Sequence, residues 1–253
     1  MTLYFGTYKL LDEDILYTTL KIAYNTGYRH FDCAELYKNQ HMIGNFFKTN
    51  NIPRESYWLT SKLSFRVIPK GEEAMRKSID KTFIDLSTNY IDLMLIHSPC
   101  KLDTLAWTIL TEYKNSGRIK NIGISNYNVE NLNHFINYVN NPADIYCNQI
   151  EFNPFLNRSD LLKLCFDNNI KVVSYGNLYK SNELIDSIAS KLKQTKEQIL
   201  LKYAIQKNLS IITTATNKEY IEMNYNLDFI IDEKDINKID QFNENFSMYK
   251  RFL

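Results

Sequence analysis

Short apolar segments alternate with longer amphipathic segments along the whole chain. The short segments are rich in β-branched and aromatic residues, which favours strands. Eight of them are expected to be strands, namely residues 3–6, 28–32, 57–62, 90–97, 119–125, 146–151, 171–175 and 210–213. The longer segments have helical spacing, as in residues 72–86, where Met75, Ile79 and Phe83 fall on one face.

Further helices are expected near residues 13–25, 40–48, 103–115, 128–138, 158–168, 182–192 and 195–207. Strands that alternate with helices are typical of a parallel sheet. Eight such units in 253 residues match the size of an α/β (β/α)8 TIM barrel, whereas an open doubly wound sheet rarely needs so regular a count. No linker or change of composition divides the chain, so we expect one domain over residues 1–253.

Composition and charge exclude several classes of protein. The formal net charge is +1, and Lys and Arg do not cluster as a nucleic-acid surface requires. No apolar segment reaches the roughly 20 residues that span a bilayer, and the N-terminus lacks the pattern of a signal peptide. We therefore expect a cytoplasmic monomer, with neither nucleic acid nor a membrane as a partner.

The positions of the cysteines and glycines limit the kinds of metal and nucleotide site that the chain can form. None of the four cysteines forms a C-x-x-C pair, which indicates reduced thiols, and no spacing of His, Cys or carboxylates resembles a set of metal ligands. The seven glycines form neither G-x-G-x-x-G nor a P-loop. The sequence thus predicts no metal, and any nucleotide must be held without a Rossmann loop.

Polar residues stand where several predicted strands end. The active site of a TIM barrel lies at the carboxyl ends of its strands. Asp32, Lys62 and His97 fall at three of these ends, and Tyr37 follows Asp32 by five residues, close enough to return over the barrel mouth. An apolar barrel interior would not hold three ionisable groups at one depth unless they satisfied one another or worked together.

Such a group supports proton transfer to a carbonyl oxygen. A tyrosine with an ordinary pKa of about 10 is a poor acid at neutral pH, and a neighbouring ammonium lowers that pKa. Lys62 is the candidate ammonium, held by an ion pair with Asp32, and His97 would orient the carbonyl. Alternatively, Asp32 and Lys62 form a structural ion pair, and His97 is a core histidine.

Several motifs resemble those of the aldo-keto reductase family. They are GYRHFDCAELY with Asp32 and Tyr37, WLTSKL with Lys62, LSTNYIDLMLIHSP with His97, then GRIKNIGISNY, NQIEFNPFLNRSDLLKLC and VVSYGNL. They cover nearly the whole chain, and several long motifs in the right order are far more specific than one short match. The resemblance implies a catalytic tetrad of Asp32, Tyr37, Lys62 and His97 that reduces a small carbonyl compound with a nicotinamide cofactor.

The resemblance also implies how the cofactor is held. Ser125, Asn126 and Gln149 would hydrogen-bond the nicotinamide carboxamide, Tyr175 would stack on its ring, and Leu178 would lie beside the pyrophosphate. The other implied cofactor contacts are Gly6, Thr7, Tyr8, Asp32, Thr214, Thr216, Tyr220 and Asn224. The expected cofactor is NADP(H), with NAD(H) also accepted.

Simpler interpretations stay open for some of these residues. Ser125 and Asn126 could cap the next helix, and Tyr175 could be a core aromatic. A barrel that binds the nucleotide as a sensor or structural subunit is the competing function, against which the complete tetrad argues. A hydrolase would want two carboxylates or a metal at the strand ends, and the sequence offers neither.

The sequence departs from the family around the pocket. The usual N-terminal hairpin is missing, because the segment that follows it begins at Gly6, and the short stretch between His97 and Trp107 predicts reduced substrate loops. Ser98 stands where the family often has tryptophan, which predicts a wider pocket. Gly176 and Asn177 replace the usual proline and glycine after the stacking tyrosine.

The segment that resembles the family's 2′-phosphate site has lost its cations. Where many members read Ile-Pro-Lys-Ser and then Arg, this chain has residues 212–215, with the sequence ITTA, and then Tyr220. Charge-assisted hydrogen bonds to phosphate are roughly twice as strong as neutral ones. Lys218 is the one positive charge nearby in the sequence, so we expect a weak preference for NADPH over NADH.

Overall fold

Eight parallel strands close into a barrel, which confirms the predicted TIM barrel. The computed structural model describes residues 2–245 and 247. The strands are β1 (Leu3–Gly6), β2 (His30–Asp32), β3 (Trp58–Leu63), β4 (Ile91–Ile96), β5 (Ile119–Ser125), β6 (Cys147–Glu151), β7 (Lys171–Tyr175) and β8 (Ser210–Thr213). Each strand pairs with its neighbours in sequence, and β8 pairs with β1 to close the ring.

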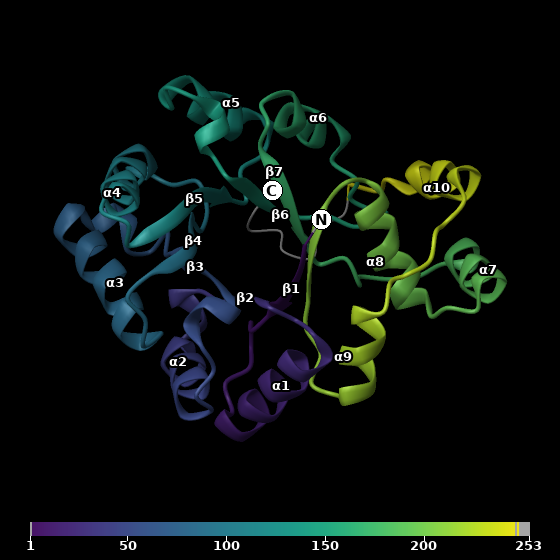
Figure 1. The fold of residues 1–253 in the computed structure, drawn as a ribbon. Coiled ribbons are helices and arrows are strands. Elements are labelled where there is room, and N and C mark those ends of the chain that lie inside the picture. Colours follow the sequence, from purple (N-terminus) through teal and green to yellow (C-terminus); the bar gives the residue numbers. More distant parts are fainter. Residues whose placement is uncertain (1, 246, 248–253) are drawn as a thin grey trace.

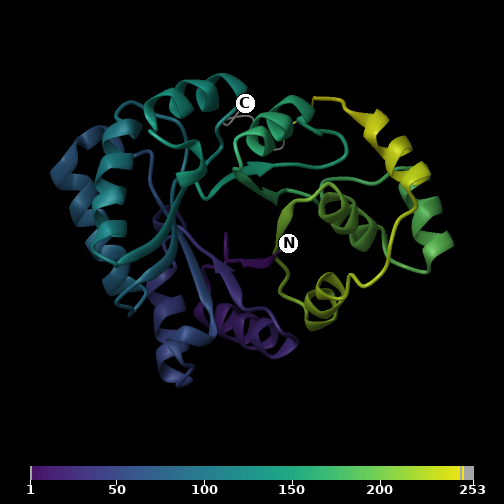
Figure 2. The ribbon, with the colours of Figure 1, turned by 45° about the horizontal axis from the view of Figure 1, so that its top comes forward.

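Helices surround this barrel, as Figures 1 and 2 show. Those in the described part of the chain are α1 (Glu13–Thr26), α2 (Gln40–Thr49), α3 (Glu72–Asp85), α4 (Asp103–Asn115), α5 (Val129–Tyr138), α6 (Ser159–Asp167), α7 (Glu183–Leu192), α8 (Lys196–Gln206), α9 (Lys218–Tyr225) and α10 (Glu233–Ile239). A short 3-10 turn, η1 (Glu35–Tyr37), lies in the loop after β2.

The sequence predicted the eight strands and the helices α1 to α8, each to within two residues at either end. It did not predict α9 and α10. The buried residues of α9 are Ile221 and Asn224, and α10 has seven residues, so neither helix carries enough apolar positions to show a helical period.

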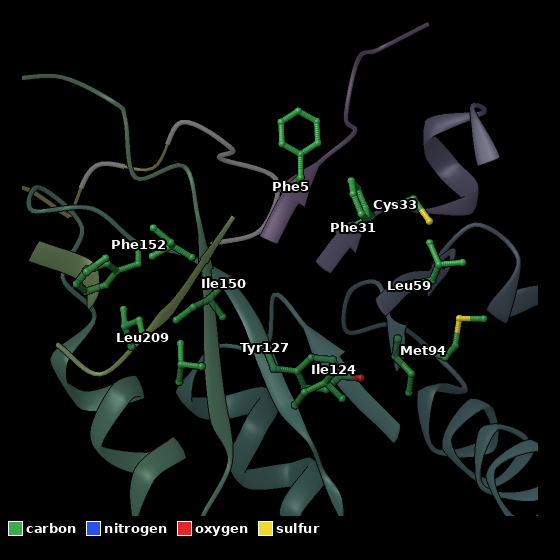
Figure 3. Packing of buried hydrophobic residues seen from close by; sticks show 14 of the residues in the cluster. Phe5, Phe31, Cys33, Leu59, Met94, Ile124, Tyr127, Ile150, Phe152 and Leu209 are labelled. Carbon is green, nitrogen blue, oxygen red and sulfur yellow. The ribbon is translucent and has the colours of Figure 1, made fainter. Parts of the chain in front are cut away.

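Two layers of apolar side chains hold the barrel together. Successive side chains of a strand point to opposite faces, so one strand can contribute to both layers, as β1 and β4 do. Phe5 and Phe31 belong to the large cluster between strands and helices (Figure 3). Tyr4, Leu93 and Leu95 belong to a smaller, separate cluster. This rigid packing fixes the strand ends from which the site is built.

The loops at the strand ends are short. Six residues, 97–102, separate β4 from α4, in agreement with the reduced loop expected there. Within residues 2–245 and 247, no helix is long and apolar enough to cross a membrane, and no three His, Cys, Asp or Glu side chains gather as metal ligands.

Candidate active site

Asp32, Lys62 and Tyr37 meet at the barrel mouth as the sequence predicted. Asp32 ends β2, Lys62 lies near the end of β3, and Tyr37 ends η1. The Lys62 Nζ donates to Asp32 Oδ1 at 2.5 Å, to the carbonyl oxygen of Cys33 at 2.9 Å and to Tyr37 Oη at 3.3 Å. An ammonium has three protons, so all three are used. Because Tyr37 Oη accepts one of them, its own proton is free to be donated elsewhere.

The Asp32–Lys62 pair is buried and well supported. Gln149 Nε2 donates to the second carboxylate oxygen of Asp32 at 2.8 Å. Lys62 is 1% exposed, and burial, the largest single influence, opposes its charged form, but Asp32, together with Tyr37 and Cys33, outweighs it and raises the pKa of Lys62. Lys62 therefore keeps its positive charge at neutral pH.

The protonation of Tyr37 corrects one expectation. Burial is the largest influence and raises the pKa of Tyr37 to about 12, while the Lys62 ammonium acts in the expected direction and lowers it. The lowering by Lys62 is as predicted, but the net pKa lies above its ordinary value, because burial, which the sequence could not show, has the larger effect. Tyr37 therefore holds its proton throughout the physiological pH range.

His97 directly follows β4 and is held neutral. Burial, and then the nearby Lys62 ammonium, lower the pKa of His97 to about 3. Its ring lies 5.9 Å from the Tyr37 ring, edge to face, and its Nδ1 is buried without a hydrogen-bond partner among the described residues. A neutral imidazole is suited to hydrogen bonding rather than to carrying charge.

A cavity of about 290 Å³ opens above this group. That volume lies near the lower end of the range of about 300–1,000 Å³ typical of small-molecule sites. Eleven predicted site residues line it: Gly6, Tyr8, Asp32, Tyr37, His97, Ser125, Asn126, Gln149, Tyr175, Leu178 and Thr214. The structure thus brings together, at one opening, residues that are spread over more than 200 positions of the chain.

Other polar side chains of the lining form a network that also reaches His97. Asn126 Nδ2 donates to the carbonyl oxygen of His97 at 2.9 Å and to Ser125 Oγ at 3.1 Å, and Asn126 Oδ1 accepts from the Tyr175 hydroxyl at 2.6 Å. The cap of α5 is Asn128, so Ser125 and Asn126 do not cap that helix. Tyr175 is half-buried and lines the cavity, which places it outside the core.

Four residues of the implied cofactor set lie outside the cavity lining. Thr7 is buried, and its Oγ1 donates to the carbonyl oxygen of Asp32 at 2.9 Å. Thr216 and Tyr220 are exposed on the loop after β8 and on α9, and Asn224 is buried on α9. Any role of these residues requires a ligand that extends from the mouth along β8 and α9.

The cavity also includes residues that the sequence analysis did not assign to the site. They are Leu36, Gly176, Asn177, Ile212 and Thr213. Asn177 is a polar residue just beyond the end of β7, so an inspection of strand ends extended by two positions would have included it in the predicted site. Leu36 and Ile212 carry no chemical signal in the sequence.

This fold and site define a parallel barrel with an acid–base group at its mouth, and comparison with known proteins defines the family. The sequence profile of the Aldo/keto reductase family matches residues 2–181. Prostaglandin F synthase 1 of Bos taurus is 30% identical over 289 residues, covering 97% of this chain and 88% of that protein. An uncharacterised oxidoreductase of Schizosaccharomyces pombe is 32% identical over 255 residues, covering 96% and 88%.

Comparison with solved structures supports the same family. An aldo-keto reductase from a Medee basin deep-sea metagenome library superposes with a TM-score of 0.91 at 29% identity, covering 98% of this chain and 93% of that one. The chain therefore belongs to the aldo-keto reductase family. It is accordingly an oxidoreductase of carbonyl compounds.

Proposed function

We propose that the protein reduces a small aldehyde or ketone to an alcohol with NAD(P)H, and that Tyr37 donates the proton. The observation that carries this proposal is the saturation of the Lys62 ammonium. Its protons go to Asp32, to the Cys33 carbonyl and to Tyr37 Oη, which leaves the Tyr37 proton available to a substrate in the cavity.

The chemistry of the lining fits a nicotinamide ring. Tyr175 offers an aromatic face, and Ser125, Asn126 and Gln149 offer the hydroxyl and amide groups that a carboxamide needs as donors and acceptors. When bound, the nicotinamide supplies the hydride. We assign the contacts farther from the ring to the remaining implied residues: Gly6, Thr7, Tyr8, Leu178, Thr214, Thr216, Tyr220 and Asn224.

Each residue of the tetrad then has its own role in the reduction of the carbonyl group. Neutral His97 hydrogen-bonds and orients the carbonyl oxygen, on which negative charge grows during reduction. Tyr37 gives that oxygen its proton, a step that a positioned general acid accelerates by about 10²- to 10⁴-fold. Lys62 stabilises the tyrosinate that remains, and Asp32 with Gln149 holds Lys62 in place.

The direct test is turnover by the purified protein. NADPH and NADH are offered with a panel of reactive aldehydes and ketones, and we expect oxidation of the cofactor that depends on the carbonyl compound. Cofactor binding without turnover across the whole panel would contradict the proposal and favour a nucleotide-binding barrel that serves as a sensor.

We also predict that NADPH is preferred over NADH by no more than about tenfold, or about 1.4 kcal/mol. Lys218 is 71% exposed in its side chain, and its Nζ lies 3.7 Å from Glu222 Oε1, which competes with a phosphate for the charge. Thr214 Oγ1 already donates to the Gly6 carbonyl at 3.0 Å. Dissociation constants for both cofactors, from quenching of tryptophan fluorescence, measure the ratio.

The variant Lys218→Ala serves as the control for this prediction. Because Lys218 is solvated and paired with Glu222, we expect its loss to change the NADPH dissociation constant less than about threefold. A preference for NADPH of a hundredfold or more in the wild type would show that a cationic side chain binds the 2′-phosphate and would contradict the prediction. If Lys218→Ala abolished such a preference, that cation would be Lys218.

A further inference from the structure

A fully buried asparagine joins two loops at the barrel mouth. Asn39 is 0% exposed and directly precedes α2. Its Nδ2 donates to the carbonyl oxygens of Thr7 at 2.8 Å and Leu10 at 3.0 Å, both in the loop after β1. Asparagine at this position often caps the following helix, but Asn39 makes no such bond, and its Oδ1 has no partner among the described residues. Both hydrogen bonds of the Asn39 side chain therefore go to the loop after β1.

The two joined loops carry tyrosines that face each other. Tyr8 lies in the loop after β1, Tyr37 lies two residues before Asn39, and the two rings are 5.0 Å apart and line the same cavity. The loop of Tyr8 is also anchored to Asp32, because the backbone N–H and Oγ1 of Thr7 both donate to the Asp32 carbonyl. The loop after β1 is thus bound to both ends of the segment 32–39, which carries Tyr37.

Toward β3, the segment 32–39 is tied near its start, where the Cys33 N–H donates to the Thr60 carbonyl at 2.9 Å and Glu35 Oε2 accepts from the Ser64 N–H at 3.3 Å. Beyond Glu35, the main chain at Tyr37 has, among the described residues, only the backbone bonds of its own turn. The N–H of Tyr37 donates to the Ala34 carbonyl at 3.0 Å, and that of Lys38 donates to the Glu35 carbonyl at 3.2 Å, both bonds of a single turn. The Tyr37 hydroxyl lies 3.3 Å from the Lys62 Nζ, at the long end of hydrogen bonding, so a small shift of the segment would break this contact.

We propose that Asn39 is a positioning residue, which sets the Tyr37 hydroxyl against Lys62 by tying the segment 32–39 to the loop after β1. The inference rests on the proposed function, since turnover reports the position of Tyr37. A positioning role lowers the rate of every folded molecule. A purely structural role lowers only the number of folded molecules.

Gln206 supplies a matched control. Like Asn39, it uses its amide for two bonds to the backbone of a distant segment, with Nε2 donating to the Ile231 carbonyl and Oε1 accepting from the Ile231 N–H, each at 2.8 Å. It ends α8, just before β8 begins, and so lies at the end of the barrel opposite the site. Gln206→Ala removes as many backbone bonds as Asn39→Ala without touching the mouth.

The experiment compares Asn39→Ala, Asn39→Ser and Gln206→Ala with the wild type. Fluorescence titration with NADPH counts the competent sites, and kcat is expressed per site. We expect kcat per site to fall by tenfold to about a hundredfold in Asn39→Ala, with the cofactor dissociation constant within threefold of the wild type. Asn39→Ser keeps one short donor and should lose less. Gln206→Ala should keep the wild-type value.

Wild-type kcat per site in Asn39→Ala would overturn the positioning role. If Asn39→Ala does not fold, the same result in Asn39→Ser overturns it. A loss in Gln206→Ala equal to that in the Asn39 variants would also overturn it, because any lost amide would then slow the enzyme. Absence of turnover in the wild type is a different result, which contradicts the proposed function itself.

Discussion

Replacing Tyr37 by phenylalanine is expected to lower kcat by about 10²- to 10⁴-fold and to leave the cofactor dissociation constant nearly unchanged. The change removes the hydroxyl that lies against the Lys62 Nζ and faces the cavity. The ring remains, and with it the packing against Tyr8 and His97. Steady-state kinetics give kcat, and fluorescence titration gives the dissociation constant.

Tyr24→Phe is the matched control for this variant. The Tyr24 hydroxyl pairs with Ser56 Oγ at 3.1 Å, and neither residue lines the cavity. Tyr24→Phe should therefore keep the wild-type kcat. Wild-type turnover in Tyr37→Phe would remove Tyr37 from the role of proton donor.

The second large effect is expected for Lys62→Met, which should lower kcat by a similar factor and also destabilise the fold. Without the ammonium, nothing offsets the burial that raises the pKa of Tyr37, so proton transfer becomes more costly. Asp32, which is 3% exposed, would keep a buried charge without its cation, at a cost of about 3–5 kcal/mol in the free energy of unfolding. Kinetics and unfolding in denaturant measure the two effects.

The double variant Asp32→Asn with Lys62→Met separates catalysis from stability. It has no uncompensated buried charge, so most of the lost free energy of unfolding should return, while kcat should stay low. An undiminished rate in Lys62→Met would contradict the role of the ammonium. Recovery of both properties in the double variant would show that the pair acts only on stability.

The sequence was sufficient to predict which residues meet at the candidate site. Alternating strand and helix patterns predicted the barrel, and the barrel predicts that strand ends share one mouth. Asp32, Lys62 and His97 lie at or next to strand ends, so their proximity followed from the fold alone. Tyr37 lies in the short loop after β2, so the fold also predicts that it lies near these strand ends.

Contacts across the closed barrel could not be predicted from the sequence. The bond from Gln149 to Asp32 joins residues 117 positions apart, and it exists only because the strands close into a ring. The raised pKa of Tyr37 likewise depends on the burial of its hydroxyl, which exists only in the folded barrel. The two bonds of Asn39 to the loop after β1 carry no sequence signal, since an asparagine before a helix is most simply explained as its cap.

Transfer of deuterium from the cofactor to the product tests the central claim most directly. The protein is mixed with an aldehyde and with NADPH or NADH deuterated at both positions of nicotinamide C4, and the alcohol is analysed by mass spectrometry. We predict that the alcohol gains one deuterium on the former carbonyl carbon with the wild type, and about 10²- to 10⁴-fold more slowly with Tyr37→Phe. Fluorescence quenching that shows bound cofactor, with no deuterated alcohol formed by the wild type, would contradict the account.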